Sequence, residues 1–142
     1  MTAPFVPESD IVMSTPFCLL IGEDNRATRE GYREYFEQAG FVVHATDDGH
    51  RVLQLARNVG PSVILLDLEL PGLDGWEIAR QVKASATTCH IPIIALTGHT
   101  HRHEQASAFR AGCDVFLAKP CEPSRLLAEI RKILGAQESS SA

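Results

Sequence analysis

The chain has 142 residues, of which 44% are hydrophobic and 22% are charged, which predicts one globular domain that can bury a core without disulfide bonds. The formal net charge of −5 disfavours non-specific nucleic-acid binding, and the four cysteines lack C-x-x-C or zinc-type spacing, which favours reduced thiols in a cytoplasmic protein. No leader peptide is evident, and no apolar run approaches the roughly 18 residues of a membrane span, so no membrane association is expected.

Short apolar runs and amphipathic stretches alternate along most of the chain. Residues 1–15 predict a flexible lead-in, residues 16–135 one domain, and residues 136–142 a flexible serine-rich tail. The apolar runs predict strands; they lie at 17–21, 41–45, 62–66, 91–96 and 114–118. The stretches between them carry helical periodicity or capping residues; they predict helices over 28–39, from the turn at 47–49 to Gly60, from Asp74 to the loop at 84–90, over 101–111 and over 122–134.

Five strands that alternate with five helices predict an α/β fold in which helices cover both faces of a parallel sheet. With right-handed crossovers, the strand order that fits this length and element count is 2-1-3-4-5, the doubly wound, flavodoxin-like arrangement. The apolar run before Asp67 is typical of a strand buried on both faces. Asp67 therefore ends this strand at the sheet edge where open α/β sheets bind ligands.

Polar side chains follow four of the predicted strands, at the carboxyl end of each. Glu23 and Asp24 follow the first strand, and the others follow in order; they are Asp67, Thr97 and Lys119. Because the carboxyl ends of parallel strands share one edge, we expect these residues to converge. Three carboxylates in one pocket repel each other and need a cation, and their hard oxygens favour Mg²⁺. The lysine and the hydroxyl can bind a phosphoryl group, so the pattern predicts a Mg²⁺-dependent site that takes phosphate on Asp67.

Four motifs carry a resemblance to a known family; they are Glu23-Asp24-Asn25, Asp67 with Leu70-Pro71-Gly72-Leu73-Asp74-Gly75, Thr97-Gly98 and Lys119-Pro120. With them, the chain resembles the receiver domain of two-component response regulators and is similar to the single-domain chemotaxis regulator. The resemblance covers about residues 16–135. Each motif alone is a weak signal, whereas all four in order, each at a strand end, are a strong one.

The resemblance implies a phosphoacceptor signalling switch rather than a turnover enzyme. Asp67 would take its phosphoryl group from a sensor histidine kinase or a phosphotransfer protein, with self-catalysed phosphotransfer and autodephosphorylation. Asp24 and Asp67 would bind Mg²⁺ directly, and Glu23 would act largely through water. Glu69 would add its backbone carbonyl to the metal ligands.

The same resemblance implies how phosphorylation is read out. Lys119 would hold the phosphoryl oxygens, Thr97 would move toward them, and Phe116 would swing inward. The face made by the fourth helix, the fifth strand and the fifth helix would then change for a downstream protein partner that the sequence does not identify. Glu69 and His99 would tune the dephosphorylation rate. Phe116 replaces the common tyrosine, and plain core packing is the alternative role for its ring.

Alternative functions share part of this pattern. A receiver fragment of a hybrid histidine kinase or of a larger regulator would carry the same motifs. No DNA-binding domain follows the last predicted helix, so direct DNA contact is not expected. An aspartyl-nucleophile phosphatase would carry its D-x-D motif after the first strand, whereas Asp67-Leu68-Glu69 follows the third. A nucleotide binder would need a glycine-rich loop where Gly22-Glu23-Asp24 is acidic.

Overall fold

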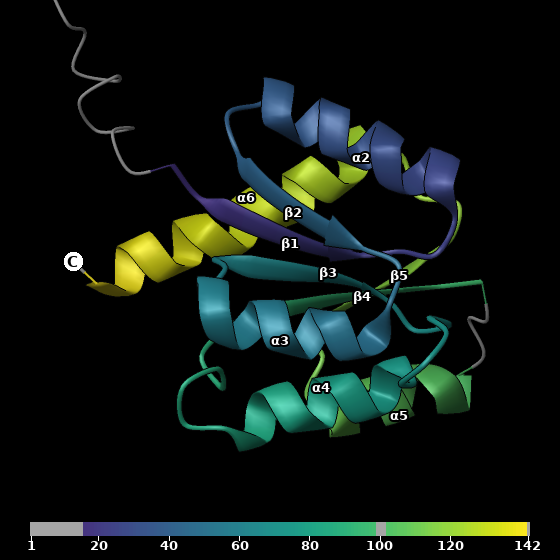
Figure 1. Cartoon of the computed structure of the whole chain (residues 1–142). Helices are drawn as coiled ribbons and strands as arrows, with labels where there is room; N and C mark the ends of the chain where they lie inside the picture. Colours follow the sequence, from purple (N-terminus) through teal and green to yellow (C-terminus); the bar gives the residue numbers. More distant parts are fainter. Residues whose placement is uncertain (1–15, 99–101, 142) are drawn as a thin grey trace, which may run out of the picture.

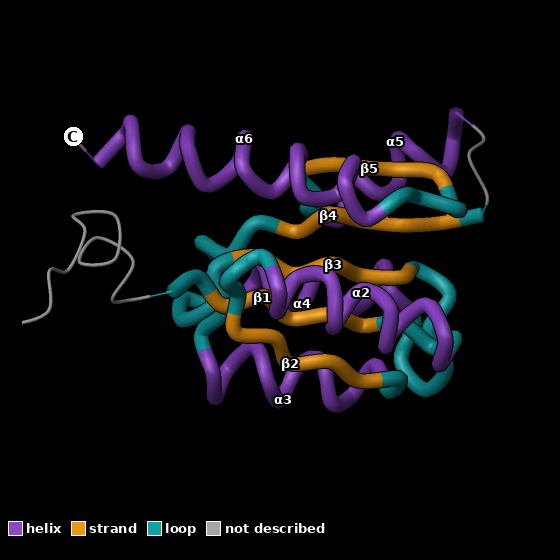
Figure 2. The backbone as a smooth tube through the Cα atoms, turned by 90° about the horizontal axis from the view of Figure 1, so that it is seen from above, coloured by secondary structure: helices purple, strands orange, loops and turns teal. Residues whose placement is uncertain are grey.

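The computed structural model describes residues 16–98 and 102–141, with side chains except at 102–105 and 136–141. Five parallel strands form one sheet in the order β2-β1-β3-β4-β5, which confirms the predicted topology (Figures 1 and 2). The strands are β1 (Cys18–Gly22), β2 (Val42–Thr46), β3 (Val63–Asp67), β4 (Ile93–Thr97) and β5 (Val115–Ala118). All five therefore end at the same edge of the sheet.

Five helices cover the two faces of the sheet. They are α2 (Arg26–Gln38), α3 (Gly49–Val59), α4 (Gly75–Ala84), α5 (Arg102–Ala111) and α6 (Pro123–Ser141). Helices α2 and α6 lie on one face, and α3, α4 and α5 lie on the other (Figure 1). In the described part of the chain, none of the helices combines the length and the apolarity that crossing a lipid bilayer requires.

The core is divided between these two faces because side chains alternate along each strand. In β3, Ile64 and Leu66 pack toward α3, α4 and α5, whereas Val63 and Leu65 pack toward α2 and α6. Every residue of β3 and β4 is buried, as expected for central strands of a sheet covered on both faces. The edge strand β2 exposes Val42.

Some element boundaries differ from the predicted ones for local reasons. Helix α2 begins at Arg26 rather than Thr28, because the Asn25 side chain caps it by accepting a hydrogen bond from Thr28 N. Strand β4 begins at Ile93, just after Pro92. Helix α6 extends to Ser141 and not only to Leu134, since alanine, glutamine and glutamate follow Gly135 and favour continued helix.

The helical period of the sequence predicts Val52, Leu55, Ala56 and Val59 as the buried face of helix α3, and the structure differs in part. Val52 and Ala56 are buried as predicted, but Leu53 takes the third inward position, while Leu55 and Val59 are only partly buried. Helix α3 contacts both the sheet and helix α4. Because of this second contact, Gly49 and Leu53 are also buried. Contact with two elements widens the apolar stripe beyond the spacing of one helix face.

Candidate functional site

Three carboxylates converge at the carboxyl edge of the sheet. Glu23 and Asp24 follow β1 directly, and Asp67 is the last residue of β3. One oxygen from each lies within 4.8 Å of the others. Glu23 and Asp67 are each only 1% exposed, whereas Asp24 is exposed. The sequence prediction that these three side chains come together is correct.

Backbone amides hold the two buried carboxylates in place. Asn25 N donates to Glu23 Oε2 at 3.0 Å, and Glu69 N donates to Asp67 Oδ1 at 2.9 Å. Each donor comes from the turn that leaves the strand, two residues past the acid. The first residues of each loop therefore fix the orientation of the carboxylate before them.

Lys119 supplies the cation of the pocket from the end of β5. Its Nζ lies 3.0 Å from Asp67 Oδ2 and 3.2 Å from Glu23 Oε1. Burial alone lowers the pKa of Lys119, but the hydrogen bond and charge of Asp67, reinforced by Glu23, outweigh burial and raise it above its ordinary value. The ammonium is therefore charged at neutral pH and offsets part of the negative charge.

Glu23 has a carboxylate oxygen that can bind a cation. Its Oε1 is buried and accepts no hydrogen bond from the residues that the structure describes, because the Lys119 contact lacks hydrogen-bond geometry. Burial raises the pKa of Glu23, and the charge of Asp67 adds to this, while the Asn25 amide and Lys119 oppose it. A buried carboxylate oxygen without a hydrogen bond, beside two further carboxylates, fits a hard divalent cation such as Mg²⁺. The three carboxylates therefore offer the donor set of a Mg²⁺ site.

Thr97 ends β4 between the strands that carry Asp67 and Lys119. It is 2% exposed, and its Oγ1 donates to Glu69 Oε1 at 2.8 Å. Gly98 N donates to the same carboxylate oxygen at 3.0 Å. The family resemblance implied a backbone carbonyl ligand and a role in the dephosphorylation rate for Glu69; it did not imply this side-chain bridge between the ends of β3 and β4.

The loop that follows Asp67 is shaped by a close backbone approach. Asp74 caps α4 by accepting from Trp76 N at 2.7 Å and from Glu77 N at 3.1 Å, as its position predicted. Gly75 packs so closely on the loop that an added Cβ would lie 2.5 Å from Leu68 Cα. The start of α4 is therefore pressed against the segment that carries Glu69.

Two further residues, Phe116 and His99, were predicted to take part in switching and in dephosphorylation. Phe116 is partly buried on β5 and packs against the core layer under α3, α4 and α5. His99 lies outside the described residues. Sequence reasoning also missed a contact of Tyr32 in α2, which donates its hydroxyl to the carbonyl of Cys121 at 2.8 Å. This bond ties α2 to the loop after Lys119.

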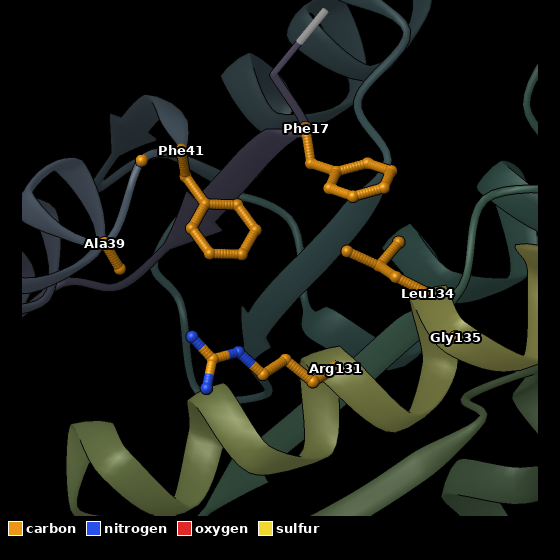
Figure 3. Close-up of a pocket in the computed structure, with 7 residues that line it drawn as sticks. Phe17, Ala39, Phe41, Arg131, Leu134 and Gly135 are labelled. Carbon is orange, nitrogen blue, oxygen red and sulfur yellow. The ribbon is translucent and has the colours of Figure 1, made fainter. Parts of the chain in front are cut away.

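A cavity of about 220 Å³ lies at the opposite, amino-terminal edge of the sheet (Figure 3). The rings of Phe17 and Phe41 and the side chain of Leu134 line it, and the Arg131 side chain extends along its margin. Phe17 and Phe41 precede β1 and β2, whereas the carboxylates follow the strands. This cavity is therefore separate from the acidic pocket.

Known proteins share both the sequence pattern and the fold. A relative from Brucella anthropi, named polar-differentiation response regulator DivK, is 31% identical over 120 residues, which cover 84% of this chain and 98% of that protein. The structure of a putative response regulator from Chloroflexus aurantiacus matches with a TM-score of 0.79 at 30% identity, over 85% of this chain and 99% of the other. A CheY-like receiver domain protein from Methanospirillum hungatei has a TM-score of 0.83 over 89% of this chain and 99% of the other, and at 24% identity it supports the fold alone.

The family itself follows from the match along the chain. Residues 19–131 match the response regulator receiver domain, and this range covers the acidic pocket, strands β2 to β5 and all of β1 except Cys18. Receiver domains act in two-component signalling as phosphoacceptors, are generally switches rather than enzymes, and imply a kinase partner. The chain belongs to the response regulator receiver domain family.

Proposed function

We propose that Asp67 is the phosphoacceptor of a signalling switch. The observation that carries this proposal is the ion pair of 3.0 Å between Asp67 Oδ2 and Lys119 Nζ inside a pocket of carboxylates. An Asp67 oxygen attacks the phosphorus atom of a phosphohistidine, an O–P bond forms, and the P–N bond breaks. Its electron pair stays on the imidazole nitrogen, which is the leaving group.

The acidic cluster supports a role for Mg²⁺ in this step. Asp24 and Asp67 would hold the ion directly, Glu23 largely through water, and Glu69 through its backbone carbonyl. When bound, Mg²⁺ neutralises negative charge on the phosphoryl oxygens and on the carboxylates. Glu23 Oε1, which is buried and accepts no hydrogen bond from the described residues, is the local reason to expect that these acids serve a cation.

The other side chains act on the phosphoryl group itself. Lys119 exchanges its contact with Asp67 for a phosphoryl oxygen, because the acyl phosphate places new negative charge beside its ammonium. Thr97 donates its hydroxyl to a second phosphoryl oxygen. Thr97 ends the neighbouring strand β4 and Lys119 follows β5, the next strand on the same side, so small movements bring both side chains to the group. The same pocket would support autodephosphorylation by water.

Phosphorylation is then transmitted to one surface. Movement of Thr97 at the end of β4 makes room for Phe116 on the neighbouring strand to turn inward, since Ala95 and Phe116 pair in register. The affected surface is formed by α5, β5 and α6. Phe109 of α5 is 48% exposed there, which supports a docking role for a downstream protein.

The phosphodonor can approach the pocket from the side of α2. A hollow of about 530 Å³ lies between α2 and the segment after β5, and Lys119, Tyr32 and Cys121 are among its lining residues. It adjoins the pocket through Lys119. We propose that a histidine kinase or phosphotransfer protein seats its phosphohistidine loop there, in the same cytoplasmic compartment.

Intact-mass spectrometry after incubation with acetyl phosphate and Mg²⁺ tests the proposal. The wild type is expected to gain one phosphate, and the adduct is expected to disappear in Asp67→Asn. Asp47→Asn is the matched control, because Asp47 is exposed and lies outside the acidic cluster. Absence of an adduct on the wild type, or an equal adduct on Asp67→Asn, would refute the proposed function.

A further inference from the structure

Glu69 holds two hydrogen-bond donors with a single carboxylate oxygen. Its Oε1 accepts from Thr97 Oγ1 at 2.8 Å and from Gly98 N at 3.0 Å. Its own backbone amide donates to Asp67 Oδ1 at 2.9 Å. Glu69 thus links the phosphoacceptor candidate to the end of β4 through both its backbone and its side chain.

The pair of donors forms a site for an anionic oxygen. A hydroxyl and an amide that converge on one carboxylate oxygen offer the same partners that a phosphoryl oxygen needs. Thr97 has one hydroxyl proton and Gly98 one amide proton, so neither can serve Glu69 and a phosphoryl group fully at the same time. Occupation by Glu69 and occupation by phosphate therefore exclude each other.

Two features allow the carboxylate to leave. The Glu69 residue is exposed, so its side chain can turn into water and recover hydrogen bonds there. Charge also favours exchange, because a phosphoryl group on Asp67 would add negative charge to a pocket that already holds Glu23 and Asp24. Repulsion would drive the Glu69 carboxylate outward once the phosphoryl group has formed.

We propose that Glu69 is a built-in competitor of the phosphoryl group: its carboxylate occupies the Thr97 hydroxyl and the Gly98 amide before phosphorylation and is displaced by it. Glu69 acts through Thr97 and is a positioning residue, not a catalytic one. This inference rests on the proposed function of Asp67. It differs from a role in the decay rate, because it sets the equilibrium for occupying the site.

The size of the effect follows from population arithmetic. The apparent affinity for a phosphoryl group is the intrinsic affinity multiplied by the fraction of molecules whose donors have been released by Glu69. Removing the competitor raises this fraction toward one. We expect about tenfold tighter binding of a phosphoryl analogue, which corresponds to about 1.4 kcal/mol.

The test compares Glu69→Ala and Glu69→Asp with the wild type. Aspartate keeps the charge but is one methylene shorter, so its carboxylate cannot reach both donors from the same backbone. Glu34→Ala is the matched control, because Glu34 is an exposed residue of helix α2. Beryllium fluoride with Mg²⁺ is the probe, as a non-covalent analogue of a phosphoryl group, and the Gly98 amide is followed by NMR.

The first readout uses protein without metal or analogue. The charge-assisted hydrogen bond shifts the Gly98 amide proton downfield in the wild type and in Glu34→Ala, and both Glu69 variants lose this shift. An unchanged Gly98 amide in the variants would overturn the inference. This readout does not depend on phosphorylation.

The second readout is the beryllium fluoride affinity. Both Glu69 variants are expected to bind about tenfold tighter than the wild type, and Glu34→Ala equally to it. Equal affinity of all proteins would overturn the inference and leave the proposed function intact. Tighter binding by Glu69→Ala but not by Glu69→Asp would also overturn it, because the effect would then come from the charge of Glu69 and not from its hydrogen bonds. Failure of the wild type to bind, or equal binding by Asp67→Asn, would refute the proposed function together with the inference.

Discussion

Lys119 Nζ lies 3.0 Å from Asp67 Oδ2, although 52 positions separate the two residues and β4 lies between their strands. The lysine side chain crosses the end of β4 to reach the carboxylate. The contact joins the first half of the sheet to the second at its carboxyl edge. Loss of this ion pair should therefore lower both the stability of the fold and the affinity for a phosphoryl group.

Lys119→Met is expected to destabilise the metal-free protein by about 1–3 kcal/mol. The substitution leaves Asp67 and Glu23 buried without their cation, while the Lys119 side chain itself is only 25% exposed. Urea unfolding without Mg²⁺ measures the effect. Lys132→Met is the control: its 3.5 Å ion pair with Glu129 lies at the surface, and it should change stability by less than about 0.5 kcal/mol. A Lys119→Met protein as stable as the wild type would contradict the assigned role of the ion pair.

Mg²⁺ is expected to raise the free energy of unfolding, because it binds the folded acidic cluster and not the unfolded chain. At a concentration of 100 times its Kd, the gain should be about 2.7 kcal/mol. Asp24→Asn should weaken Mg²⁺ binding by about tenfold or more, through loss of a charged ligand. Titration calorimetry measures the affinity, with Asp47→Asn as the control. Equal affinities for the two variants would exclude Asp24 as a ligand.

Much of this architecture could be predicted from local sequence patterns. Apolar runs and helical spacing indicate an alternating α/β chain, and parallel topology alone brings Glu23, Asp67, Thr97 and Lys119 to one edge. The convergence follows from strand direction and needs no knowledge of side-chain conformation. For this reason, the acidic pocket was predictable while finer contacts were not.

The contacts that were missed depend on tertiary structure. The Glu69 side chain reaches Thr97 because the loop after β3 is held by the close approach of Gly75 to Leu68, which no local pattern reveals. The bond from Tyr32 to the carbonyl of Cys121 spans 89 positions. Helix α3 buries Leu53 because it contacts α4 and the sheet together. Such contacts are set by packing of elements rather than by residue spacing.

Tyr32→Phe is expected to destabilise the protein by about 0.5–1.5 kcal/mol below pH 10, because the Cys121 carbonyl loses its donor. Burial, together with the neighbouring charges of Cys121 and Glu23, raises the pKa of Tyr32 from 10.0 to about 12. The folded state therefore keeps this proton when the unfolded state has lost it. The stabilisation by Tyr32 is complete below pH 10 and is lost as pH rises toward 12.

Urea unfolding of the wild type and Tyr32→Phe across this alkaline range measures how the stabilisation by Tyr32 changes with pH. The stability difference between the two proteins should shrink as pH rises from about 10 to 12. A difference that stays constant, or that grows with pH, would show that Tyr32 does not ionise later in the folded protein. An absorbance titration of tyrosinate should also lose its highest step in the variant.

Gly75→Ala is expected to destabilise the protein by about 1–3 kcal/mol, since an added Cβ would meet backbone atoms of Leu68, including its Cα at 2.5 Å. Gly31→Ala is the matched control in the interior of α2, where the added methyl meets nothing within 4 Å. That change should stabilise the protein by about 0.5–1 kcal/mol. Thermal unfolding of both variants measures the two stability changes, which should have opposite signs. Equal changes would show that the close approach at Gly75 does not constrain the loop.

The central claim is that Asp67, among three clustered carboxylates, accepts the phosphoryl group. The most direct measurement is reduction with sodium borohydride after incubation with acetyl phosphate and Mg²⁺, followed by peptide mass spectrometry. Borohydride converts the acyl phosphate of an aspartate to homoserine and so marks the acceptor permanently. The account predicts homoserine at position 67 and unmodified Glu23 and Asp24. Homoserine at position 24, or an intact Asp67 in phosphorylated protein, would contradict it.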